Sequence, residues 1–271
     1  MPNLYVVATP IGNLEDISLR AIRILREVKL IAAEDTRKTR ILLDKYEIKT
    51  PLTSYYEHNK IEKMDYILNQ LEVIDLALVS EAGMPGISDP GYELIAAASE
   101  KGISIIPIPG PSAIISALAV SGLPTDRFTF IGFLPRRIGE RRHALESVAN
   151  ETGTIITYEA PHRIQETLND ILYVLGDRKI AVCREITKIY EEIFRGSVSE
   201  ALQHFNDPRG EFTLVIEGKS KEKPRLTDDI VLKLEALHQS GVGAREAVAT
   251  VVKETGLSRK EVYQAWLKLL S

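Results

Sequence analysis

The sequence predicts an α/β protein, with two α/β domains followed by a small helical domain. In the first 120 residues, short apolar runs alternate with helical patterns, which is typical of βαβ units and a largely parallel sheet. A second alternating series follows residues 121–124, where glycine and proline interrupt the chain. A polar, lysine-rich segment then precedes a tail with helical patterns only. We therefore expect domains at residues 1–120, 121–220 and 225–271.

The first domain opens with an apolar run that ends in a turn at residues 10–13. Ser18 then precedes apolar residues spaced three apart, a spacing that predicts one face of a helix. Loops that follow parallel strands gather at one edge of the sheet, where open α/β proteins bind small molecules. The expected strands are 4–9, 30–33, 75–80 and 103–108, and the expected helices are 19–28, 61–71, 92–101 and 113–120.

The second domain shows the same alternation, and we expect more antiparallel pairing in its sheet. Its expected strands are 127–133, 154–158, 179–184 and 211–217, and its expected helices are 141–149, 163–175 and 199–205. In the tail, Thr227 is placed to cap one helix and residues 244–254 form a second. Ser258 with Glu261 is a capping box that begins a third helix.

Composition excludes several classes of function. The chain has 271 residues, a net charge of −4 and one cysteine, so an internal disulfide is impossible and RNA binding must come from local charge. Cys183 lies in an apolar run and is expected to be a small core residue rather than a nucleophile. The chain has no P-loop and no GxGxxG fingerprint, so binding of a nucleoside triphosphate or NAD is not expected. It also has no zinc pattern and no HExxH motif, so we expect no metal-dependent hydrolysis and no bound metal. With no basic leader and no apolar stretch of about 20 residues, we expect a cytoplasmic protein without a membrane span.

The most informative segment is residues 80–91, which follow an apolar strand and contain three glycines and two prolines. Such a loop presents backbone N–H and C=O groups to a ligand, although a rigid turn at a sheet edge has the same composition. A similar loop, residues 106–113, follows the next expected strand and opens a helix. Ser112 could cap that helix, or the open helix terminus could receive a carboxylate. Two such loops after neighbouring strands favour a shared binding site.

Eight motifs in fixed order carry a resemblance that covers nearly the whole chain. Together they closely resemble the bacterial 16S ribosomal RNA (cytidine-2′-O)-methyltransferases, which belong to the tetrapyrrole methylase superfamily. The motifs are residues 7–14, 33–37, 54–59, 80–91, 109–112, 158–163, 183–188 and 210–214.

The resemblance implies a two-domain α/β fold of tetrapyrrole methylase type that binds S-adenosylmethionine in a cleft between the domains, and it implies a homodimer. The superfamily's Gly-Asp-Pro loop corresponds to residues 83–85, where Met84 replaces the aspartate, so we expect this loop to hold the cofactor by backbone and shape. The residues expected at the cofactor are Pro10, Gly83, Met84, Pro85, Ile87, Ser88, Ser112, Ala113, Tyr158, Phe212 and Thr213.

A neutral ribose 2′-hydroxyl is a poor nucleophile, so a general base should assist methyl transfer. The candidates are Glu34, Asp35 and His58, with Glu81 as a further carboxylate. Alternatively, Glu34 and Asp35 could form a salt bridge with Arg37, and His58 could be an ordinary surface histidine. The residues expected to contact RNA are Asn13, Arg37, Asn59, Arg136, Arg137, Arg141 and Arg163, and the less favoured alternative for the arginines from 136 to 142 is a solvated helix start.

The expected function is therefore methylation of a cytidine ribose in 16S ribosomal RNA, with the small ribosomal subunit or its free RNA as partner. A tetrapyrrole- or diphthine-type methyltransferase and a non-enzymatic RNA-binding factor are the alternatives. The motifs at residues 33–37 and 158–163 and the helical tail favour the first interpretation. The tail could contact RNA or serve docking or dimerisation.

Overall fold

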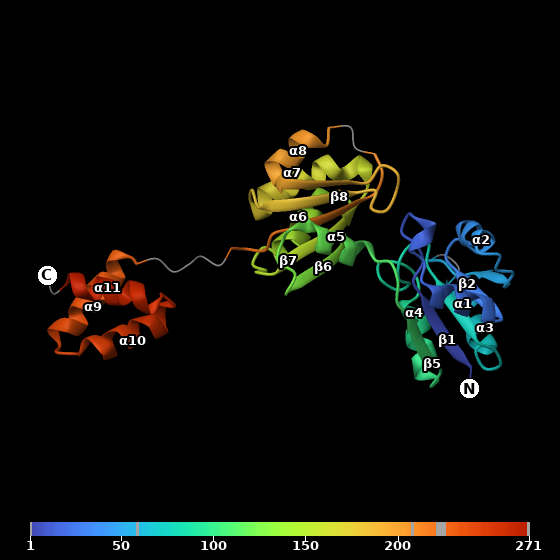
Figure 1. The fold of residues 1–271 in the computed structure, drawn as a ribbon, viewed down its shortest axis with the longest axis horizontal. Coiled ribbons are helices and arrows are strands. Elements are labelled where there is room, and N and C mark those ends of the chain that lie inside the picture. Colours follow the sequence, from blue (N-terminus) through green and yellow to red (C-terminus); the bar gives the residue numbers. More distant parts are fainter. Residues whose placement is uncertain (1, 58–59, 207–208, 221–225, 270–271) are drawn as a thin grey trace. The chain divides into compact units, whose positions relative to one another are not determined.

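The computed structural model describes residues 2–57, 60–206, 209–220 and 226–269. The chain forms two compact units, Met1–Lys219 and Ser220–Ser271, and the first contains both sheets. Figure 1 shows the strands and helices along the chain.

The first sheet is fully parallel, with the strand order β3-β2-β4-β1-β5. The four expected strands are present, together with a short strand that was not predicted. The strands are β1 (Asn3–Val7), β2 (Leu30–Ala33), β3 (Leu52–Ser54), β4 (Leu76–Val79) and β5 (Ser104–Ile108). Because Ala33 is paired with Val79, Glu34 and Ser80 leave the sheet side by side at its carboxyl edge.

Helices connect these strands, as the alternating pattern predicted. They are η1 (Leu14–Asp16), α1 (Leu19–Glu27), α2 (Thr36–Lys45), α3 (Lys60–Gln70) and α4 (Tyr92–Glu100). Only α2 and the single turn η1 were not predicted. Two clusters of buried apolar side chains pack this half, one built around Leu25 and Ile31 and the other around Leu4 and Leu78.

The second sheet is mixed, with the order β6-β7-β10-β8-β9, and the expected antiparallel pairing is present. Its strands are β6 (Phe128–Phe133), β7 (Thr154–Glu159), β8 (Lys179–Arg184), β9 (Glu192–Ser197) and β10 (Phe212–Ile216). β6 pairs with β7 in parallel, and the other three pairings are antiparallel. Its helices are α6 (Ile138–Ser147), η2 (Pro161–Arg163), α7 (Ile164–Leu175) and α8 (Val198–His204).

Helix α5 (Ala113–Ser121) joins the two sheets. It follows β5 of the first sheet, but Ile114, Ala117 and Leu118 pack on apolar residues of the second. Cys183 belongs to this cluster, is fully buried, and has a thiol pKa raised to about 11 by burial. A buried thiol with a raised pKa is inert as a nucleophile, in agreement with a core role.

The second unit contains α9 (Asp228–Gln239), α10 (Ala244–Thr255) and α11 (Arg259–Lys268), in agreement with the expected helical tail. Val251, Val262 and Trp266 are among the residues of its own buried core. The predicted capping box is present at the start of α11, where Ser258 accepts a bond from the backbone of Glu261. Among the described residues, no helix is long and apolar enough to cross a membrane.

Candidate functional site

A cavity of about 710 Å³ lies within the first unit, at the carboxyl edge of the parallel sheet. Its walls come from the segments after β2, β4 and β5 and from β6, β7, β8 and β10 of the second sheet. This volume is in the range of small-molecule sites, and its position at the strand ends is the one that open α/β sheets use for ligands.

The loop of residues 80–91 forms one wall of the cavity. Thr9 and Gly83 exchange backbone hydrogen bonds of 2.9 and 3.0 Å, which fix the loop to the end of β1. Gly83 has φ of 83° and Gly91 has φ of 143°, conformations that strain any residue with a side chain. Ser88 adopts φ of 63° without being glycine, a strain that clusters at functional sites.

The second glycine- and proline-containing loop forms the neighbouring wall. Ser112 caps α5, because its side chain accepts a hydrogen bond from the backbone of Ile115, and it also lines the cavity. The backbone N–H of Ile114 donates to the hydroxyl of Tyr158 on β7, which connects this wall to the second sheet. Burial, followed by the nearby charge of Asp89, raises the pKa of Tyr158 to about 12, so the phenol stays protonated.

Most residues expected at the cofactor face this one cavity. Nine of the eleven line it: Gly83, Met84, Ile87, Ser88, Ser112, Ala113, Tyr158, Phe212 and Thr213. Pro10 and Pro85 do not line the cavity, because both are buried within the turns that carry its walls. The sequence motifs therefore converge on one cavity.

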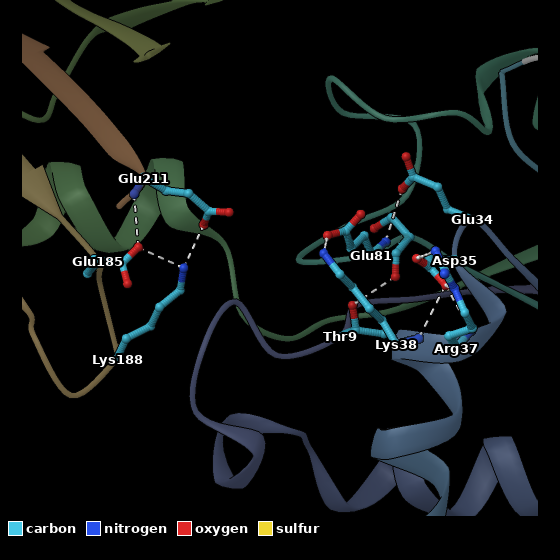
Figure 2. A network of polar contacts seen from close by, with 10 residues as sticks. Thr9, Glu34, Asp35, Arg37, Lys38, Glu81, Glu185, Lys188 and Glu211 are labelled. Atoms are coloured by element: carbon cyan, nitrogen blue, oxygen red, sulfur yellow. Dashed lines mark hydrogen bonds and ion pairs between the residues drawn. The ribbon is translucent and has the colours of Figure 1, made fainter. Parts of the chain in front are cut away.

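The carboxylates expected to serve as a base have different surroundings (Figure 2). Glu34 lines the cavity and accepts a hydrogen bond of 3.0 Å from the backbone of Glu81; burial raises its pKa, while nearby Lys38 lowers it. Glu81 also lines the cavity and forms an ion pair with Lys38.

Asp35 is held by its own helix. It caps α2 by accepting bonds from the backbone of Arg37 and Lys38, which lower its pKa, and it does not line the cavity. This placement argues against Asp35 as a base. His58 and Asn59 lie outside the described residues.

The sequence reasoning missed Asp89, which lines the cavity. Burial, followed by the charge of Glu34, raises the pKa of its carboxyl from 3.8 to about 6, and a hydrogen bond from Ser80 opposes this shift. From the sequence, the loop of residues 80–91 is informative for its backbone only. The signal that could have revealed Asp89 was an acidic residue inside a loop already expected to form the site.

Across the cavity, Lys188 bonds two carboxylates at 2.9 Å each, Glu185 and Glu211, and Glu211 lines the cavity (Figure 2). This segment closely approaches the first loop of the chain. A Cβ atom added to Gly12 would lie 2.5 Å from Cγ of Lys188 and 2.6 Å from Oγ1 of Thr187. Gly12 is therefore required for this contact between the two halves of the unit.

The residues expected to contact RNA fall into two groups. Arg141 is 2% exposed and donates to the carboxylate of Asp170 at 2.6 Å. Arg163 is also largely buried and donates to the carbonyls of Leu134 and Pro135. Both guanidinium groups serve the packing of the second half, which argues against the phosphate contacts that we expected of them.

The other described residues that we expected to contact RNA lie at the surface. Arg136 and Arg137 are exposed, and Arg137 forms an ion pair with Glu140 of the helix that it precedes. The side chain of Arg37 is 91% exposed. Asn13 caps η1, and its own backbone N–H donates to Thr187.

Comparison with known proteins agrees with this architecture. The family described as Tetrapyrrole (Corrin/Porphyrin) Methylases matches residues 3–202. A protein named Ribosomal RNA small subunit methyltransferase I from Halalkalibacterium halodurans is 46% identical, over 97% of this chain and 94% of its own length. A protein of the same name from Thermotoga maritima is 51% identical over 81% of this chain and 100% of its own.

Two solved structures show the same fold at low identity. Diphthine synthase superposes with a TM-score of 0.63 at 12% identity, covering 80% of this chain and 90% of its own. A cobalt precorrin-4 methyltransferase superposes with a TM-score of 0.58 at 15% identity, covering 79% of this chain and 94% of its own. By the family match and the close relatives, the chain is a methyltransferase and belongs to the tetrapyrrole methylase family.

Proposed function

We propose that this protein transfers a methyl group from S-adenosylmethionine to the ribose 2′-hydroxyl of a cytidine in 16S ribosomal RNA. The observation that carries the proposal is the large cavity onto which the family's motifs converge in this structure. The names of the close relatives, which act on small-subunit ribosomal RNA, support the choice of acceptor.

The cavity suits S-adenosylmethionine by its chemistry. Apolar side chains such as Ile11, Met84 and Phe130 offer surface for an adenine ring. The described lining residues include five carboxylates and neither lysine nor arginine, which favours a ligand that carries a positively charged sulfonium. The amino-terminal end of α5 at Ala113 would receive the carboxylate of the methionine moiety.

The nine cavity-lining residues of the motifs would contact the cofactor, and Pro10 and Pro85 would shape the loops that hold it. When bound, the cofactor supplies an electrophilic methyl group on sulfur. The chain must place the acceptor oxygen behind that methyl group, and such positioning provides much of the rate. Of the bases expected from sequence, Glu34 has the position to take part, and His58 remains a proposal.

Exposed basic side chains are proposed to hold the RNA phosphates. Arg136, Arg137 and Arg37 have this exposure, and Asn13 and Asn59 are proposed to orient the nucleotide. We further propose that the protein is a cytoplasmic homodimer that acts on the small ribosomal subunit or on its RNA.

The test is methylation of the proposed acceptor. Isolated 30S subunits and naked 16S RNA are incubated separately with the protein and methyl-labelled S-adenosylmethionine, and the labelled nucleoside is identified after digestion. We expect 2′-O-methylcytidine from one of the two substrates. Label in neither RNA, despite cofactor binding measured by calorimetry, would defeat the ribose proposal.

A further inference from the structure

Asp89 differs from the other acidic residues that line the cavity. Glu81 is paired with Lys38, and Glu211 is paired with Lys188. Asp89 has no cationic partner among the residues that the structure describes, so its negative charge is not neutralised.

Glu159, another carboxylate of the cavity, is also occupied. It accepts hydrogen bonds from Thr167 at 2.5 Å and from the backbone of Ala160 at 2.8 Å, and it forms an ion pair with Arg163. These bonds hold Glu159 in place among residues of the part of the unit that contains the second sheet. It is therefore unsuited to receive a proton from a substrate.

Three elements converge on the Asp89 carboxyl. Ser80, at the end of β4 and 1% exposed, donates a hydrogen bond to it, and Glu34 at the end of β2 acts on it by charge. The charge of Asp89 in turn raises the pKa of Tyr158, which lines the same cavity from β7 of the second sheet. Ser88, directly before Asp89, holds the strained φ of 63° that aims this part of the loop.

Asp89 is placed to exchange protons at neutral pH. Burial and Glu34 raise the pKa of its carboxyl to about 6, so the group is mostly ionised at pH 7 but retains some basicity. Burial also raises the pKa of Glu34, although nearby Lys38 opposes the rise, but the Glu34 carboxylate already accepts a hydrogen bond of 3.0 Å from the backbone N–H of Glu81. The efficiency of general base catalysis is greatest when the pKa of the base is near the working pH.

We propose that Asp89 is the catalytic base that takes the proton from the acceptor hydroxyl, which enters the cavity beside Tyr158. This inference rests on the proposed function. As the acceptor oxygen forms its bond to the methyl carbon, the carbon–sulfur bond breaks and its electron pair stays on sulfur. The hydroxyl proton passes to the Asp89 carboxylate. The positive charge of the sulfonium and the negative charge of the carboxylate are therefore both removed.

The test compares Asp89→Asn with wild type, and Asp65→Asn serves as a matched control. Asp65 is an exposed carboxylate on α3 that does not line the cavity. For Asp89→Asn, we expect kcat on ribosomal RNA to fall by about 100-fold or more, in the range of general base catalysis. The dissociation constant for S-adenosylmethionine, measured by calorimetry without RNA, should change less than about threefold, and the control should match wild type.

A pH profile separates a base from a merely structural residue. For the wild type, kcat/KM should decrease as the pH falls through about 6, which gives the profile an acidic limb. Ser80→Ala removes a hydrogen bond that stabilises the ionised carboxylate, so it should move this limb to higher pH. Asp89→Glu should retain the limb at reduced kcat, and these two variants keep the test valid if Asp89→Asn does not fold.

Three results would overturn the assignment. The first is an Asp89→Asn variant that keeps more than one third of wild-type kcat. The second is a loss of activity in that variant that weaker cofactor binding alone explains. The third is an acidic limb of the pH profile that Ser80→Ala does not move. Failure of the proposed function gives a different result, because wild type itself would then leave the RNA unlabelled. In that case the pH dependence of folding stability still reports whether Asp89 titrates near pH 6.

Discussion

The buried ion pair between Arg141 and Asp170 gives a sharp prediction about stability. Asp170 is 3% exposed, and it accepts one bond from Arg141 at 2.6 Å and one from Arg142 at 2.7 Å. Replacing Asp170 with alanine leaves the Arg141 guanidinium buried, and its other carboxylate partner among the described residues is the exposed Glu166 at 3.3 Å. Breaking a buried pair in this way costs about 3–5 kcal/mol of the free energy of unfolding.

For a unit of this size, that loss corresponds to a fall in Tm of roughly 6–20 °C. Urea denaturation and thermal melting followed by circular dichroism measure both quantities. The control is Glu140→Ala, which breaks the exposed pair with Arg137 and should lose less than about 1 kcal/mol. The double variant Arg141→Met with Asp170→Leu should recover most of the loss, because an apolar pair can replace a buried ion pair.

A loss below about 1 kcal/mol for Asp170→Ala would refute this reasoning, because it would mean that the arginine is solvated rather than held as a buried charge. The double variant also tests function. If it folds with near-native stability and still binds ribosomal RNA as wild type does, the role of Arg141 is packing. If it folds but binds RNA more weakly, Arg141 contacts phosphate after all.

Three further predictions follow from other parts of the chain. Gly12→Ala places a Cβ within 2.6 Å of two side chains, so cofactor affinity measured by calorimetry should fall at least several-fold; unchanged affinity would show that the approach to the second half is not needed. Arg136→Ala combined with Arg137→Ala should flatten the salt dependence of RNA binding, by about 0.7–0.9 in log–log slope for each phosphate that the variant no longer neutralises. Because Asp89 has its pKa raised to about 6 in the folded state, its favourable contribution to stability is present below about pH 4 and disappears as the pH rises through 6. Asp89→Asn should therefore match wild type in Tm at pH 4 and exceed it at pH 8, and equal values at pH 8 would contradict the raised pKa.

The sequence predicted most strands of both sheets, because strands whose residues are largely buried are continuous apolar runs that the residue types reveal directly. The missed elements lack such a signal. β3 has only three residues, and β9 is an edge strand whose sequence mixes charged and apolar residues with glycine. α2 was missed because its cap, Asp35, was interpreted as chemistry rather than as a helix start.

The cofactor-facing residues were predictable as a set, because their motifs are carried by loops whose glycines fix the path of the backbone. Side-chain roles were harder, since they depend on partners far along the chain. Arg141 and Asp170 lie 29 residues apart on different helices, and no local pattern marks them as a pair. Asp89 acquires its raised pKa from burial and from Glu34, which is 55 positions earlier in the sequence.

The charge of the cavity also sets where the RNA can be held. Its described lining residues offer five carboxylates and no basic side chain, so a phosphate drawn into it would be repelled by a carboxylate without a cationic partner, such as Asp89. At 4 Å and an effective dielectric constant of 20, one such repulsion amounts to about 4 kcal/mol. We therefore expect the target ribose to enter the cavity while its flanking phosphates stay outside, on exposed arginines such as Arg136 and Arg137. A protein with a net charge of −4 can then bind RNA and a cationic cofactor at the same time, because the two opposite demands are met in different places.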